Sequence, residues 1–154
     1  SVFYRKHAFD FHAVAARQFE HADGAAGVLA GLEWTRRNAP ECAWVASVPT
    51  DGPFLPRDLV ARLAAAVERS GADMACAASG GRTHPVVGLW PVRLAGDLRR
   101  AMVEEDMRKV DAWTGRYRLE QVDFAIEPFD PFFNTNRPED LEAAEALLRD
   151  GAGR

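Results

Sequence analysis

The chain has 154 residues, a length that normally folds as one domain with a sizeable hydrophobic core. Apolar residues make up 47% and charged residues 27%, which is typical of a soluble globular protein. The formal net charge of −4 argues against a nucleic-acid-binding module, and no apolar stretch approaches the length of a membrane span.

Cysteine usage and the start of the chain suggest where the protein works. Cys42 and Cys76 are far apart and have no Cys or His partner at zinc-binding spacing, which predicts two reduced, non-catalytic thiols. No basic-then-apolar leader is present. We therefore expect a cytoplasmic protein that is not exported.

Helix and strand patterns alternate along the chain, without internal repeats or a linker. In chain order the sequence predicts a loop and helix over 24–37, a strand over 43–48, a helix over 56–70, a strand over 73–78, a turn at 80–81, a strand over 86–91, helices over 93–102 and 109–117, a strand over 120–127, and a last helix from Pro138.

Two of these elements carry a clear facial pattern. The helix over 56–70 should stop at Gly71 and bury one face, formed by Leu59, Leu63, Ala66 and Val67. The strand over 120–127 alternates, with Val122, Phe124 and Ile126 on one face.

Strands separated by helices indicate an α/β fold in three layers. We expect a Rossmann-like, mostly parallel sheet covered on both faces, with the strand over 120–127 as the candidate antiparallel member. Residues 1–154 should form a single domain.

The most informative stretch is 44–56, where an apolar run delivers Asp51 into a turn that contains three prolines. The prolines end the strand, so Asp51 lies at its carboxyl end, where α/β sheets bind ligands. A single carboxylate is enough for Mg²⁺, because this ion also accepts phosphate oxygens and water as ligands. The plainer interpretation is that Asp51 and Gly52 form an ordinary turn.

Four segments together resemble a known family. They are 23–32 (DGAAGVLAGL), 44–56 (WVASVPTDGPFLP), 82–90 (RTHPVVGLW) and 132–141 (FFNTNRPEDL). In this order and spacing they resemble the molybdenum cofactor guanylyltransferases, the MobA-like nucleotidyltransferases, over roughly 24–148. The resemblance implies the nucleotidyltransferase variant of the three-layer fold. It also implies transfer of GMP from GTP to molybdopterin with Mg²⁺ and release of pyrophosphate.

The same resemblance implies roles for particular residues. Asp51 would be the metal ligand and the catalytic residue. Gly24 and Gly27 would belong to a loop that cradles phosphates, although this sequence lacks the proline that the family usually has there. The positions implied for the pterin substrate are Arg82, His84, Asn134 and Asn136.

Structural alternatives stand beside each of these roles. Gly27 and Gly31 are four residues apart and fit close packing of a helix on the sheet equally well. His84, expected in a loop between two strands, could cap a turn while Arg82 is solvated. Asn136 stands two residues before Pro138, where it could cap the last helix.

Residues 1–23 match the family poorly. Family members begin with a strand and a Leu-Ala-Gly-Gly loop, followed by Arg-Met-Gly and Asp-Lys, and Ser1 to Phe19 contains no glycine. We expect the chain to be N-terminally truncated relative to the family. Either it is a shortened or altered gene product, inactive because it lacks the nucleotide half-site, or further residues precede Ser1.

Two rival functions remain. A related CTP-using molybdopterin cytidylyltransferase is the enzymatic rival, because the base-reading residues belong to the missing region. The other is a non-catalytic remnant that binds molybdopterin or a molybdoenzyme maturation protein. Pyrophosphate release distinguishes these functions: release with GTP indicates the guanylyltransferase, release with CTP the cytidylyltransferase, and release with neither the non-catalytic remnant.

Overall fold

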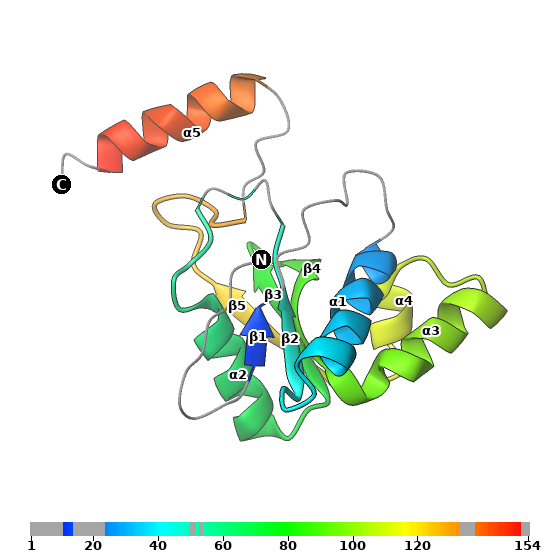
Figure 1. The fold of residues 1–154 in the computed structure, drawn as a ribbon. Helices are drawn as coiled ribbons and strands as arrows, with labels where there is room; N and C mark the ends of the chain where they lie inside the picture. The colour runs from blue at the N-terminus through cyan, green and yellow to red at the C-terminus, as the bar shows by residue number, and fades with distance from the viewer. Residues whose placement is uncertain (1–10, 14–23, 50–51, 53, 133–137, 152–154) are drawn as a thin grey trace.

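The computed structural model describes residues 11–13, 24–49, 52, 54–132 and 138–151. Figure 1 shows the course of the chain. The elements are β1 (Phe11–Ala13), α1 (Gly24–Asn38), β2 (Trp44–Ser47), α2 (Leu59–Ser70), β3 (Met74–Ser79), β4 (Arg82–Pro91), the 3₁₀ turn η1 (Val92–Leu94), α3 (Ala95–Glu104), α4 (Val110–Thr114), β5 (Leu119–Phe124) and α5 (Pro138–Gly151).

The described strands form one open sheet in the order β1-β2-β4-β3-β5. β1 pairs with β2 in parallel, as β3 does with β5, while β4 is antiparallel to both of its neighbours. Four strands therefore share one direction, and the expected mostly parallel α/β sheet is confirmed.

The antiparallel strand is β4, so the expectation that the strand over 120–127 might be antiparallel is wrong. Gly80 and Gly81 both have positive φ angles, 53° and 77°, and close a tight hairpin that reverses the chain between β3 and β4. β5 follows two helices, and this long crossover returns it parallel to β3.

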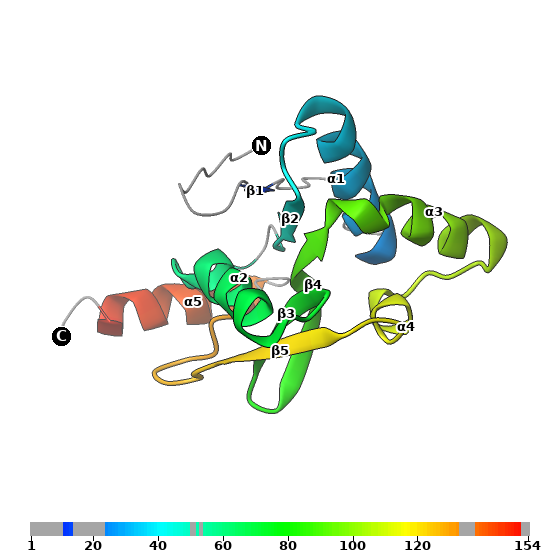
Figure 2. The same cartoon turned by 90° about the horizontal axis from the view of Figure 1, so that it is seen from below.

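Helices cover both faces of the sheet, as Figures 1 and 2 show. α2 packs on one face in a core that includes Leu63, Leu89 and Phe124. On the other face α1, α3 and α4 enclose a second core around Trp90 and Trp113. The three-layer arrangement is thus confirmed.

The amphipathic pattern predicted for α2 is confirmed in detail. Leu59, Leu63, Ala66 and Val67 are all buried. Gly71 follows with φ 65°, and its N–H donates to the carbonyl of Val67, a left-handed cap that ends the helix.

Helix α1 begins at Gly24, so residues 24–31 form helix and the expected loop there is wrong. Gly31 lies against the sheet, where a Cβ would stand 3.3 Å from the Val45 side chain. This contact supports the packing explanation for that glycine. An ion pair fastens α1 to α3, since Arg99 donates to both carboxylate oxygens of Glu33 at 2.5 and 2.6 Å.

Several other boundaries differ from the sequence expectations. β4 begins at Arg82 instead of Val86, because hairpin pairing with β3 extends it. The helix expected over 109–117 is only five residues long. β5 ends at Phe124, and Ile126 is 45% exposed beyond it instead of sharing the buried face.

The last helix, α5, lies apart from the sheet in Figure 1, and Leu148 on it is 56% exposed. Among the described residues no helix combines the length and apolarity needed to cross a membrane.

Candidate functional site

The carboxyl ends of β2, β3 and β5 meet at one edge of the sheet, because these strands run in the same direction. Ligands in open α/β sheets bind at such an edge. Asp51, Asn134 and Asn136 lie outside the described residues, so their roles stay predictions. The described residues at this edge of the sheet define the candidate site.

A hydrogen-bonded group lies at this edge between the β3–β4 hairpin and the segment that follows β5. The Ser79 hydroxyl is 2.7 Å from Nε2 of His84 and 2.9 and 3.0 Å from the two carboxylate oxygens of Asp130. The backbone N–H of Phe132 also donates to Asp130, at 2.9 Å. The His84 and Phe132 rings lie against each other with centroids 4.5 Å apart.

The direction of the hydrogen bonds follows from the donor inventory. A carboxylate only accepts, so the single Ser79 proton goes to Asp130 and Ser79 must accept from Nε2–H of His84. Ser79 is therefore no nucleophile waiting for a base. In the neutral ring this leaves the lone pair on Nδ1 of His84, which can accept a hydrogen bond from a ligand.

His84 is set up to remain neutral. Burial lowers its pKa below the ordinary value of 6.5; the nearby Asp130 opposes that shift and Arg82 adds to it. Contrary to expectation His84 lies within strand β4 and not in a loop. Arg82 and His84 are two residues apart on this strand, so they face the same side of the sheet, and Arg82 is exposed.

Two aromatic side chains connect the segments around the predicted residues. Phe54, three positions after Asp51, packs on Phe129, five positions before Asn134, with ring centroids 4.6 Å apart. The turn after β2 and the segment after β5 thus approach each other at the carboxyl edge.

Gly24 places the amino end of α1 near the same edge. A Cβ on Gly24 would stand 2.7 Å from the Val86 side chain. Because Ser47, the last residue of β2, pairs with Gly88, Val86 lies beyond the end of β2. Gly27 is inside the helix, so α1 can offer an anion its first-turn N–H groups but not the predicted loop.

Sequence reasoning missed Ser79 and Asp130. One signal was available for Ser79, a hydroxyl that ends the otherwise apolar run of β3. Asp130 lies 51 residues from its partner, and no local pattern connects them.

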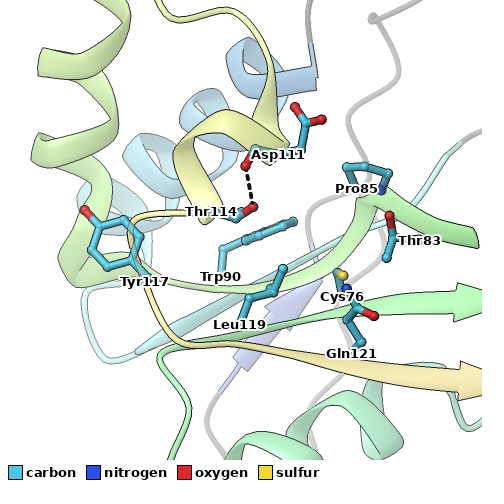
Figure 3. A pocket seen from close by; sticks show the side chains of 10 residues that line it. Cys76, Thr83, Pro85, Trp90, Asp111, Thr114, Tyr117, Leu119 and Gln121 are labelled. Atoms are coloured by element: carbon cyan, nitrogen blue, oxygen red, sulfur yellow. Dashed lines mark hydrogen bonds between the residues drawn. The ribbon is translucent and has the colours of Figure 1, made fainter.

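A hollow of about 340 Å³ opens on the other face of the sheet, beneath α4. Figure 3 shows Thr83 and Pro85 from β4, Gln121 from β5 and Asp111 from α4 around it. Thr83 and Pro85 flank His84 in sequence, and neighbouring residues of a strand point to opposite faces. Strand β4 therefore lines the hollow on one face and carries His84 on the other.

No three His, Cys, Asp or Glu side chains in the described part of the chain are grouped to hold a metal ion. Mg²⁺ would therefore depend on a carboxylate such as Asp51 together with substrate oxygens and water. That donor set is chemically suitable, since Mg²⁺ is commonly held by one or two carboxylates and substrate phosphates.

Comparison with known sequences identifies similar proteins. Residues 4–122 match the family described as the MobA-like NTP transferase domain. Proteins named molybdenum cofactor guanylyltransferase from Rhodopseudomonas palustris (strain HaA2) and Bradyrhizobium sp. (strain ORS 278) are 56% and 57% identical to the chain over 122 residues. Each alignment covers 79% of this chain but only 57% and 58% of the relative, so the chain spans less than two thirds of their length.

Solved structures share the fold. The chain superposes on molybdopterin-guanine dinucleotide biosynthesis protein A from Archaeoglobus fulgidus with a TM-score of 0.60 and 23% identity, over 82% of this chain and 63% of that one. A putative protein from Aquifex aeolicus gives a TM-score of 0.61 with 16% identity, over 81% and 70% of the two chains. At these identities the likeness concerns the fold alone.

Proposed function

Because the chain belongs to the MobA-like NTP transferase domain family, we propose that it takes part in transfer of GMP from GTP to molybdopterin. A phosphate oxygen of molybdopterin attacks the α-phosphorus of GTP, and pyrophosphate leaves. The relatives named molybdenum cofactor guanylyltransferase support GTP over CTP. We expect this reaction to take place in the cytoplasm, where GTP is available.

The observation that carries the proposal is the contact between His84 and Phe132. This contact brings the strand that holds Arg82 and His84 next to Phe132, which precedes Asn134 and Asn136 in the sequence. By the resemblance these four residues serve the pterin substrate, and in this proposal they act together with Asp51. The Phe54–Phe129 contact supports the same convergence.

Each residue has a distinct role in this proposal. Asp51 holds Mg²⁺, which when bound shields the negative charge of the nucleotide phosphates. The Arg82 guanidinium pairs with the terminal phosphate of molybdopterin. His84 accepts a hydrogen bond at Nδ1, and the Asn134 and Asn136 amides supply further donors and acceptors. The free N–H groups of the first turn of α1, which begins at Gly24, face the phosphates of the nucleotide.

The reaction is mainly one of positioning. Phosphoryl and nucleotidyl transfers depend on alignment and charge neutralisation, and need no covalent chemistry from the protein. The guanine dinucleotide product is useful only once it reaches a molybdoenzyme, so a molybdoenzyme maturation protein is the partner we expect.

The test is pyrophosphate release by the purified chain with Mg²⁺, molybdopterin and either GTP or CTP. We expect release with GTP, loss of it in Asp51→Ala, and retention in Asp58→Asn, a control that alters an exposed acid at the start of α2. Release with CTP alone would replace GTP by CTP in the proposal. No release with either nucleotide, or full activity in Asp51→Ala, would refute the proposed chemistry.

A further inference from the structure

We propose that the hollow beneath α4 binds the 2-amino-4-oxopyrimidine ring of the pterin, while the phosphate of the same molecule reaches Arg82. This inference rests on the proposed function and adds a ring-binding site to it. None of the residues assigned to the pterin so far lines this hollow.

The location suits one molecule that bridges the two faces of β4. Thr83 and Pro85 line the hollow, and Arg82 is the residue next to Thr83 at the exposed start of the strand. A ligand with a ring in the hollow can therefore extend over the hairpin toward Arg82. One nearby cation fits the single phosphate of molybdopterin better than it fits a triphosphate.

The back of the hollow is apolar and fixed in place. Gly88 lacks a side chain, and a Cβ there would stand 2.3 Å from the Trp90 ring, so the indole lies across the strand at Gly88. The indole N–H donates to Ser47 at 2.7 Å, and Ser47 in turn donates to the carbonyl of Val86 at 2.6 Å. Trp90 is 0% exposed, so the indole forms a fixed apolar floor beneath the hollow.

The polar groups around the hollow select a ligand that donates hydrogen bonds. Asp111 accepts from the Ala112 N–H through Oδ1 at 2.9 Å, and no bond to its Oδ2 is found within the described residues. Thr114 donates to the backbone carbonyl of Asp111, which leaves its oxygen as an acceptor. Lys and Arg are absent from the described lining, so a phosphate group finds no counter-charge inside.

A pterin ring matches this set. Its 2-amino group and the adjacent ring N–H can both donate to the carboxylate of Asp111, and its 4-oxo group can accept from the Gln121 amide. Figure 3 shows Asp111 and Gln121 on opposite sides of the Trp90 indole, with the Asp111 carboxylate turned away from that ring. The volume of about 340 Å³ lies near the small end of the roughly 300–1,000 Å³ range of ligand pockets, which suits a bicyclic ring.

The wall that carries Asp111 is anchored from behind. Asp97 on α3 accepts hydrogen bonds from the Trp113 indole and from the Tyr117 hydroxyl. Trp113 belongs to α4 and Tyr117 follows it, so these hydrogen bonds hold α4 against α3. They fix this wall of the hollow without any contact from a ligand.

Guanine carries the same donor pattern as a pterin, so the experiment must separate the two rings. Binding of pterin itself, 2-amino-4-oxopteridine, is followed through its own fluorescence, without Mg²⁺ or nucleotide. Lumazine, the 2,4-dioxo analogue, is the matched control ligand because it lacks the amino donor. Guanosine is added as a competitor.

We expect pterin to bind about tenfold more tightly than lumazine, and Asp111→Asn to remove that difference, since one hydrogen bond to a charged group has about this effect. Gln121→Leu should weaken the binding of both pterin and lumazine. Asp123→Asn is the matched control, because Asp123 lies two residues further along the same face of β5 and does not line the hollow. All three substitutions are at exposed positions, so the thermal midpoint should not change.

Each remaining outcome has a stated meaning. Equal binding of lumazine and pterin, or unchanged binding in Asp111→Asn, would refute the ring site. Tight guanosine binding with no pterin binding would assign the hollow to the nucleotide and also refute it. Pterin binding that depends on Asp111, in a chain that releases no pyrophosphate, would support the site and refute the transferase reaction. If the chain releases pyrophosphate but its KM for molybdopterin is unchanged in Asp111→Asn, the transferase reaction is supported and the ring site is refuted.

Discussion

At the scale of single residues, the hydrogen bonds around Ser79 fix the state of His84. Because Ser79 donates to Asp130, the ring of His84 must carry its proton on Nε2. Long-range ¹H–¹⁵N correlation of the imidazole should show this tautomer almost alone. Ser79→Ala should give a mixture, whereas Ser70→Ala, at the other end of the sheet, should leave the spectrum unchanged. A ring protonated on Nδ1 in the unaltered protein would contradict the assignment.

The same group gives a pH dependence whose sign is defined. The pKa of His84 is lowered in the folded state, chiefly by burial, so the unfolded chain takes up this proton first as the pH falls. The contribution of His84 to stability is therefore complete above pH 6.5 and is lost as the pH falls through its lowered pKa. Affinity for the ligand at Nδ1 should decline over that same range, and titration of the His84 ring resonances checks both.

Cys76 should be inert even though it lines the hollow. Burial raises the pKa of its thiol to about 11, so almost no thiolate exists at neutral pH. Iodoacetamide at pH 8 should modify Cys76 in the folded protein far more slowly than in urea, as peptide mass spectrometry can measure. Rapid alkylation of the folded chain would show that the thiol is neither buried nor fully protonated.

At the scale of elements, two helical glycines give a matched pair. Gly96 lies at the exposed start of α3 with open space around its missing Cβ, whereas Gly31 lies against Val45. Gly96→Ala should stabilise the protein by about 0.5–1 kcal/mol through helix propensity. Gly31→Ala gains the same propensity but must displace the Val45 side chain, so its gain should be smaller or absent. Urea unfolding of both variants tests this, and equal gains would contradict close packing of α1 on β2.

Sequence patterns predicted the elements that depend on local signals. The spacing of Leu59, Leu63 and Val67 gave the buried face of α2, and Gly71 gave its end. Strand direction is not a local property, because it depends on whether a connection is a hairpin or a crossover. The alternating pattern of 120–127 makes it the candidate antiparallel strand, but the hairpin makes β4 the antiparallel one. The sequence predicts a loop at His84 because this segment lies between two strand patterns, whereas hairpin pairing with β3 extends β4 through it.

The same distinction holds for the candidate site. Arg82 and His84 could be named from their motif, but their link to the segment after β5 is formed by Ser79 and Asp130, 51 residues apart. The hollow likewise combines β3, β4, α4 and β5, and Asp111 and Gln121 have no sequence signature. Residues that come together only when the chain folds therefore cannot be recognised as a site from the sequence.

At the scale of the whole molecule, the site depends on bringing distant segments to one edge of the sheet. Phe54 and Phe129, 75 positions apart, form a ring contact between the turn after β2 and the segment after β5. Both rings are half-buried and neither belongs to the two hydrophobic core clusters, so the contact adds little to the core. Its consequence should instead be the approach of the Asp51 turn to the asparagines.

A double-mutant cycle on Phe54→Ala and Phe129→Ala can measure this approach. Aromatic pairs contribute roughly 0.5–1.5 kcal/mol beyond their buried area, so urea unfolding should give a coupling energy in that range. Each single variant should also raise the KM for molybdopterin, because the turn and the segment no longer hold each other. Val103→Ala, at a 74% exposed apolar side chain on α3, is the control and should change neither quantity. Strictly additive free energies with an unchanged KM would mean that the two segments reach the edge independently, and the proposed convergence of Asp51 with the paired amides would lose its structural support.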